Sequence, residues 1–371
     1  MKVCFVSPRL YLYLSSNSER PAGGAQRQQS MISTALANRG YEVWAIVADY
    51  GQRVRERHEG VDLVKGVPER ISGPQSVVSS LYGLTRAMYI ASPDIYLVRG
   101  APRLATATYS LSRLFRKRFV FRVANDADVD PSYLKSRYPQ LLIHLYRIAI
   151  SHAEAVIAQT QRQRQLLREH FNVEASLVPN GYDLPSPSKI LSHEKREHVL
   201  WVGSSDPEKK NPRLFVQLAS QLPDLEFTMI SQPIAGDEDF HNDLREAAES
   251  VENINFTGPV APDAIHDYYR TAMLLVNTSD YEGFPNTFLE AWRFETPTLS
   301  LYFDLGELLE NEVGGMRASS IENLAAITEE LASNDSRRAE LGADGRSYMK
   351  ENYSLSKVVN RYQKAFEGAL K

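Results

Sequence analysis

The sequence predicts an α/β protein that is built from two doubly wound, parallel-sheet domains. The chain has 371 residues, which exceeds one ordinary core and fits two domains of about 150 to 200 residues. Short β-branched or apolar runs alternate with longer segments of helical period, a pattern typical of parallel sheets covered by helices on both faces. A stretch rich in Pro, Ser, Lys and Glu at residues 183–197 interrupts the alternation near the middle of the chain.

The first half of the chain contains five apolar runs that are short enough to be fully buried parallel strands. These candidate strands are residues 3–6, 43–47, 95–98, 119–123 and 155–158. Segments of helical period lie between them, such as residues 25–38, which Gly40 stops, and residues 140–151. The alternation predicts that residues 1–182 form an N-terminal Rossmann-like domain.

The alternation restarts after residues 183–197, which we interpret as a solvated linker between two cores. The candidate strands are then residues 199–202, 225–230, 254–256, 273–276 and 298–302, with candidate helices at 212–221 and 240–251. This pattern predicts a second Rossmann-like domain over residues 198–352. The chain after Ser319 is expected to be helical in three segments, and the segment 353–371 could pack back on the N-terminal domain.

Composition and charge exclude several classes of protein. With 43% hydrophobic and 24% charged residues, the chain matches neither a disordered protein nor a disulfide scaffold. The net charge of -4 offers no global field for nucleic acid, so we expect no nucleic-acid partner. Cys4 is the single cysteine, which excludes an intramolecular disulfide and suits a reducing compartment. The G-x-G-x-x-G and P-loop fingerprints are absent, which disfavours nicotinamide, flavin and P-loop enzymes.

The N-terminus begins with a strand-like segment in place of a signal peptide, and the apolar stretches fall short of the ~20 residues that span a bilayer. We therefore expect a cytoplasmic protein whose membrane contact, if any, is peripheral on the inner face. Arg113, Arg116, Lys117 and Arg118 form a basic cluster at the end of a candidate helix. This cluster either complements the helix dipole on a solvated face or contacts anionic lipid headgroups.

The most informative stretch is residues 277–290, NTSDYEGFPNTFLE, which follows a candidate strand and enters a candidate helix. The start of this helix should leave backbone N–H groups unpaired at the carboxyl end of the sheet, which suits a diphosphate. Glu290, about one turn into the helix, can accept hydrogen bonds from two ribose hydroxyls, and Glu282 would face the other end of the ligand. A carboxylate at each end of an amide cradle predicts a site for a nucleotide sugar.

The segment E-G-F-P-N-T-F-L-E resembles the E-x7-E motif of retaining glycosyltransferases with the GT-B fold, in particular family 4. Three further landmarks of that family occur in order: Gly23-Gly24, VPNGYD at 178–183 and VGSSDPEKKNP at 202–212. The resemblance covers nearly the whole chain and implies two Rossmann-like domains that face each other across a cleft. It implies a retaining, metal-independent transfer of sugar from a UDP- or GDP-sugar to a saccharide, lipid-linked or other hydroxyl acceptor, in polysaccharide or glycoconjugate biosynthesis.

The same resemblance assigns site residues. Glu290 corresponds to the glutamate that binds ribose, and Glu282 to the glutamate near the donor sugar. Gly24, preceded by Gly23, corresponds to the glycine that lets the backbone approach the donor phosphates. The positions at the sugar and the diphosphate correspond to Gly283, Phe284, Pro285, Asn286 and Thr287.

The sequence departs from the family in the cations that stabilise the departing diphosphate, for which an R-x4-K pair is usual. Alignment on Gly203 places Ser204 where the arginine would be. Either Lys209 or Lys210 fits the lysine, because one extra residue precedes Asn211. The strength of diphosphate binding therefore depends on one lysine unless another cation compensates.

The family's histidine in the loop after residues 119–123 is also missing, so Asn125 or Asp126 would position the donor sugar. Asp126 and Asp128 have the D-x-D spacing of a metal site, but we interpret them as polar loop residues and expect neither a metal nor a cofactor. A catalytic histidine is dispensable if the departing phosphate itself takes the acceptor proton. Two alternatives stay open: a non-hydrolysing sugar-nucleotide epimerase, and a non-catalytic nucleotide-binding relative that supports a partner enzyme.

Overall fold

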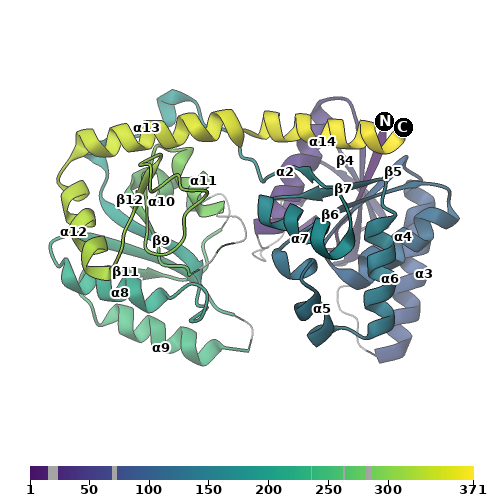
Figure 1. The fold of residues 1–371 in the computed structure, drawn as a ribbon, viewed down its shortest axis with the longest axis horizontal. Coiled ribbons are helices and arrows are strands. Elements are labelled where there is room, and N and C mark those ends of the chain that lie inside the picture. The colour runs from purple at the N-terminus through teal and green to yellow at the C-terminus, as the bar shows by residue number, and fades with distance from the viewer. Residues whose placement is uncertain (16–23, 69–72, 235, 262–263, 281, 283–285) are drawn as a thin grey trace. The chain divides into compact units, whose positions relative to one another are not determined.

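The computed structural model describes residues 1–15, 24–68, 73–234, 236–261, 264–280, 282 and 286–371. Their contacts divide the chain into two compact units (Figure 1). The N-terminal unit comprises Met1–Gly181 together with Leu355–Lys371, and the C-terminal unit comprises Tyr182–Ser354. Each unit is a mainly parallel sheet covered by helices, which confirms the predicted α/β class with two such domains.

The N-terminal unit contains, among the described residues, an eight-stranded sheet in the order β3-β4-β2-β1-β5-β6-β7-β8. Only β3 and β4 pair antiparallel, at one edge of this sheet as it is described. Strands β1, β2 and β5 are buried on both faces, because helices cover both sides. The strands are β1 (Lys2–Val6), β2 (Glu42–Asp49), β3 (Arg55–His58), β4 (Val61–Pro68), β5 (Ile95–Arg99), β6 (Arg118–Arg122), β7 (Ala155–Ala158) and β8 (Ser176–Leu177). The helices are α1 (Tyr11–Leu14), α2 (Gly24–Asn38), α3 (Gly73–Ala91), α4 (Pro102–Leu114), α5 (Pro131–Arg137), α6 (Gln140–Ser151) and α7 (Gln161–Phe171), with a 3-10 turn at Asp126–Asp128.

The C-terminal unit contains a six-stranded sheet over its described residues, in the order β11-β10-β9-β12-β13-β14 with every neighbouring pair parallel. Its strands are β9 (His198–Ser204), β10 (Glu226–Gln232), β11 (Ile254–Thr257), β12 (Ala272–Asn277), β13 (Thr298–Ser300) and β14 (Gly315–Arg317). Its helices are α8 (Pro212–Gln221), α9 (Glu238–Glu249), α10 (Ile265–Thr271), α11 (Asn286–Trp292), α12 (Ile321–Ala332) and α13 (Asp335–Asn352), with 3-10 turns at Pro187–Lys189 and His193–Lys195. The carboxyl ends of β9 and β12 are therefore neighbours, and the loops that follow them carry the motif residues.

Helix α14 (Leu355–Leu370) belongs to the N-terminal unit, where it contacts α2, β6 and β7 (Figure 1). Its apolar face, which includes Val358, Tyr362 and Phe366, is buried in one cluster with the strands of that unit. The Tyr362 ring also lies over the guanidinium group of Arg122, 5.5 Å from the ring centroid. Burial lowers the pKa of Arg122, and its Nη2 donates to Oδ1 of Asn180 at 2.7 Å. A segment that begins 197 residues after the end of β7 (158 to 355) therefore completes the core of that unit.

Replacing Phe366 with alanine is expected to lower the free energy of unfolding by about 3 to 5 kcal/mol, because a fully buried aromatic side chain leaves a cavity under α14. Denaturant unfolding followed by circular dichroism measures the change. Leu370→Ala on the same helix is the matched control, since Leu370 is 42% exposed, and it should change stability by less than about 0.5 kcal/mol. Equal losses in the two variants would show that α14 does not dock as described.

The interpretation of residues 183–197 as a solvated linker is wrong for its second half, which is packed into the C-terminal unit. Arg196 is 5% exposed, and its Nη1 donates to Oγ1 of Thr296 at 2.8 Å. The backbone oxygen of His193 accepts from Nη2 of Arg338 at 3.0 Å. Burial, assisted by the two nearby arginines, lowers the pKa of His193 to about 3. Arg196 and His193 are thus buried in the C-terminal unit, although the sequence around them looks solvent-exposed.

Candidate active site

The loop after β9, residues 205–211, takes its shape from Asp206. Its carboxylate oxygen Oδ1 accepts hydrogen bonds from the backbone N–H groups of Glu208 at 3.1 Å and Lys209 at 2.9 Å. Its backbone oxygen accepts from the N–H of Lys210 at 2.9 Å. An aspartate that bonds to its own backbone two and three residues on stabilises a compact turn. Both candidate lysines are therefore held at fixed backbone positions.

Three hydrogen bonds join this loop to the segment that follows β12. The hydroxyl of Thr278 donates to the carbonyl of Lys210 at 2.6 Å, and the N–H of Asp280 donates to the carbonyl of Lys209 at 3.1 Å. The side-chain amide of Asn211 donates to the carbonyl of Thr278 at 3.4 Å. Because these two loops follow neighbouring strands, the bonds bring the lysine pair and the glutamate motif together at one edge of the sheet.

Lys210, and not Lys209, is the lysine whose ammonium group forms an ion pair with Glu282. The same carboxylate oxygen of Glu282 accepts a hydrogen bond from the hydroxyl of Ser279 at 2.9 Å. The two charged side chains are 18% and 8% exposed, so the pair is shielded from water on most sides. The ion pair places Lys210 beside the glutamate motif, and which of the two lysines contacts the phosphate stays a prediction.

Glu290 lies in α11 and is 8% exposed. Its Oε1 accepts a hydrogen bond from the hydroxyl of the buried Tyr182 at 3.0 Å, and the Arg293 guanidinium group lies 5.8 Å from the centroid of that tyrosine ring. No role is assigned to Tyr182 from the sequence alone, although its position in the VPNGYD motif could have indicated one. Asn286 and Thr287, which begin α11, are partly exposed. The hydroxyl of Tyr182 fixes the orientation of the Glu290 carboxylate.

Gly203 and Ser204 end β9 at the same edge of the sheet. A Cβ atom on Gly203 would come within 2.7 Å of the indole ring of Trp201, so this packing requires a glycine there. The Trp201 indole N–H in turn donates to the hydroxyl of Thr278 at 3.0 Å. Ser204 pairs with Gln232 of β10. The space over Gly203 is thus filled by a side chain that supports the Thr278 segment.

A hollow of about 450 Å³ adjoins these loops in the C-terminal unit. Asn211 and Asp280, from the two joined loops, contribute to its wall. The guanidinium group of Arg213 also lines it and lies 5.2 Å from the ring centroid of Phe240. The hollow therefore offers a ligand a cation, a carboxylate and an aromatic ring next to the two joined loops.

Asn125 and Asp126 lie in the N-terminal unit, in a loop that Asp128 holds together. Oδ2 of Asp128 accepts from the N–H groups of Ala124 at 2.8 Å and Asn125 at 3.0 Å, while burial raises its pKa. Oδ1 of Asp126 accepts from the Gln163 side chain at 3.1 Å. Both aspartates thus accept hydrogen bonds that hold the loop together. Within the described part of the chain, no group of three or more His, Cys, Asp or Glu residues could hold a metal ion.

Gly23, Gly283, Phe284 and Pro285 lie outside the described residues, so their assignments stay predictions. Gly24 is the first residue of α2 in the N-terminal unit.

The basic cluster at the end of α4 is partly neutralised. Nη1 of Arg113 lies 2.7 Å from a carboxylate oxygen of Glu154, and Nη1 of Arg118 lies 3.6 Å from the same atom. Glu154 thus neutralises part of the charge of two arginines in the cluster, which weakens the attraction of the cluster for anionic headgroups. Among the described helices, none has the length and apolar character that crossing a bilayer requires.

Family comparisons match both units. A family model described as "Glycosyltransferase Family 4" matches residues 22–185, and one described as "Glycosyl transferases group 1" matches residues 196–334. The chain is 22% identical over 286 residues to the amylovoran biosynthesis glycosyltransferase AmsD of Erwinia amylovora, which covers 75% of this chain and 77% of AmsD. It is 26% identical over 180 residues to the alpha-monoglucosyldiacylglycerol synthase of Streptococcus pneumoniae. That match spans 44% of this chain and only 40% of the synthase.

Solved structures with the same fold cover almost the entire chain. Sucrose-phosphate synthase from Thermosynechococcus elongatus superposes with a TM-score of 0.78 at 16% identity, covering 99% of this chain and 98% of the synthase. Anabaena HepE, solved in complex with UDP and glucose, superposes with a TM-score of 0.74 at 15% identity and covers 99% of both chains. At these identities the likeness establishes the fold.

Proposed function

Because the chain belongs to glycosyltransferase family 4 and has the GT-B fold, we propose that it transfers a sugar from a UDP-sugar to a hydroxyl acceptor with retention of anomeric configuration and without a metal ion. The epimerase alternative does not fit the family. The non-catalytic alternative is kept because Ser204 occupies the position of the family arginine.

One observation carries the proposal: the two motif glutamates and one lysine are held at the carboxyl edge of the C-terminal sheet. Lys210 and Glu282 form a shielded ion pair, and Glu290 is oriented by Tyr182. Carboxyl ends of parallel strands are where open α/β sheets bind their ligands. In the proposed complex, Glu290 accepts from the ribose hydroxyls, Lys210 lies against the diphosphate, and Glu282 accepts from hydroxyls of the donor sugar.

The proposed reaction needs no protein nucleophile. The bond between the anomeric carbon and the diphosphate oxygen breaks, and the acceptor oxygen forms a new bond to that carbon on the same face. The acceptor proton passes to the departing phosphate, so UDP and the glycoside are the two products. Lys210 stabilises the negative charge that develops on the leaving group, and such fixed charges act most strongly where water is excluded.

The choice of UDP over GDP is supported by HepE, which shares the fold and was solved with UDP. A role in polysaccharide or glycolipid synthesis is supported by the names of the two relatives, one an amylovoran biosynthesis enzyme and the other a diacylglycerol glycolipid synthase.

Thermal unfolding with nucleoside diphosphates tests the donor proposal. UDP at 100 times its Kd should stabilise the folded protein by about 2.7 kcal/mol, and GDP should stabilise it less. NMR of the product should show the anomeric configuration of the donor, and turnover should persist in EDTA. Absence of stabilisation by any nucleoside diphosphate would contradict the donor site. A product of inverted anomeric configuration would contradict only the proposed retention. Nucleotide binding without turnover on any acceptor would favour a non-catalytic nucleotide-binding protein.

A further inference from the structure

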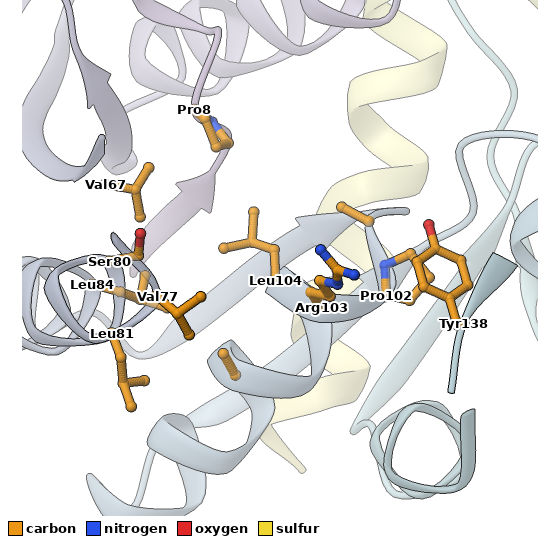
Figure 2. A pocket seen from close by; sticks show the side chains of 12 residues that line it. Pro8, Val67, Val77, Ser80, Leu81, Leu84, Pro102, Arg103, Leu104 and Tyr138 are labelled. Carbon is orange, nitrogen blue, oxygen red and sulfur yellow. The ribbon is translucent and has the colours of Figure 1, made fainter. Parts of the chain in front are cut away.

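The N-terminal unit contains a groove of about 720 Å³ that is built from residues with no part in the proposed donor site (Figure 2). Val77, Leu81 and Leu84 of α3 form one wall, and Figure 2 shows them opposite residues of α4. Leu104 and Ala107 of α4 contribute to the other wall. The i, i+4, i+7 spacing along α3 places its three side chains on one face of that helix. The volume lies in the range of sites that hold small organic ligands, about 300 to 1,000 Å³.

The groove opens at the carboxyl edge of the N-terminal sheet. Pro8 follows β1, Val67 lies near the end of β4, and Ala101 follows β5, and all three line it. Strand β2 lies on one side of β1 in the sheet, and β5, which comes later in the chain, lies on the other side. The strand order therefore reverses between β1 and β5. Open α/β sheets bind ligands at this point, because the connections there diverge and leave a crevice.

The lining is mainly apolar, which is unusual for a site that would hold a bare sugar. Saccharides are recognised by many hydroxyl partners, whereas the polar side chains on this groove are Ser80, Arg103 and Tyr138. The apolar surface also continues outward along α3, where Val78 and Tyr82 are 70% and 71% exposed. Exposed apolar patches next to a pocket mark binding surfaces, since water is a poor solvent for them.

We propose that this groove holds the hydrocarbon chain of a lipid-borne acceptor whose hydroxyl headgroup receives the sugar. The proposal rests on the glycosyltransferase function and names its acceptor class. The cation at Arg103 is complementary to an anionic group on the same amphiphile, such as a phosphate, while the aliphatic walls match its chain. The exposed residues of α3 then face the lipid phase from which the acceptor comes.

Calorimetric titration of the full chain with n-hexyl, n-octyl and n-decyl β-D-glucoside, each below its micellar concentration, tests the proposal. Each pair of added methylenes should tighten binding by up to about 15-fold, because every methylene enters an apolar environment. Leu81→Gln makes one wall polar at a half-exposed position, and Ala107→Phe fills the groove. Both changes should flatten the dependence on chain length. Leu141→Gln, at a 70% exposed position on α6 outside the groove, is the matched control and should leave it intact.

Stabilisation by UDP, measured on every variant, separates this proposal from the function on which it rests. Preserved UDP stabilisation shows that the groove variants are folded. If UDP binds but glucoside binding does not depend on chain length, the groove proposal is overturned and the donor site is retained. If glucoside binding depends on chain length but UDP does not bind, only the donor site is overturned. Self-association that Leu81→Gln abolishes, without chain-length dependence, would assign the groove to a second copy and overturn the proposal.

Discussion

Replacing Glu290 with alanine or glutamine is expected to lower kcat/KM by about 100-fold or more, the scale at which one preorganised polar contact is lost. The carboxylate is 8% exposed and is oriented by the Tyr182 hydroxyl, so it is ready to accept two hydroxyl hydrogen bonds without rearrangement. Because these bonds form in the bound substrate as well as in the transition state, KM and the Kd for UDP should rise together. Steady-state kinetics and calorimetry with UDP measure both effects.

Tyr182→Phe is the matched control for Glu290. It removes the hydroxyl that orients the carboxylate but leaves the carboxylate itself, so we expect a loss of no more than about tenfold. Glu290→Gln keeps the size of the side chain, which guards against a loss caused by misfolding. Activity of Glu290→Gln within threefold of the unaltered protein would remove this residue from the site.

Replacing Lys210 with alanine is expected to lower kcat by about 100-fold to 1,000-fold, with a smaller change in KM. The ammonium group lies against Glu282 at the edge where the diphosphate is proposed to bind, and charge on the leaving group grows as the glycosidic bond breaks. Ser204 stands where the family has an arginine, so Lys210 carries a larger share of this stabilisation. Single-turnover kinetics at saturating donor isolate the chemical step.

Lys209→Ala supplies the control, because the neighbouring lysine has the same charge and sits on the same loop. We expect it to lose less than about tenfold, since Lys209 holds the loop through its backbone carbonyl, which alanine retains. Lys210→Arg should recover part of the rate by restoring a cation. Circular dichroism checks that leaving Glu282 without its partner has not unfolded Lys210→Ala. A larger loss in Lys209→Ala would reverse the assignment of the two lysines.

Most strands inside the two sheets could be predicted from the sequence, because strands buried on two faces are continuous apolar runs. Each of the ten candidate runs overlaps a strand of the structure. The edge strands β3, β8 and β14 could not be predicted in this way, and neither could β4, which lies beside β3. Strand β3 has the sequence RERH, and β4 carries Asp62 and Lys65 among its apolar residues. Edge strands need less apolar surface, so their sequences are hard to distinguish from loops.

The candidate site was predictable only where a local pattern defines it. The spacing of Glu282 and Glu290 indicated both glutamates, because the motif is contiguous in the chain. The choice between Lys209 and Lys210 was ambiguous, and hydrogen bonds between loops about 70 residues apart determine that Lys210 approaches Glu282. Arg196 shows the same limit, because partners such as Ala272 and Thr296 lie far away in the sequence while its own neighbourhood looks solvated.

The position of α14 imposes an order on the maturation of the polypeptide. The sheet that starts with β1 emerges early from the ribosome, yet the helix that covers part of it is translated only after the whole C-terminal unit. Until α14 has been translated, the apolar surface of the N-terminal unit that later packs against Val358 and Phe366 is exposed to water and can bind chaperones. A fragment ending at residue 181 would keep that surface permanently bare, so the two units cannot be separated by a single cut without loss.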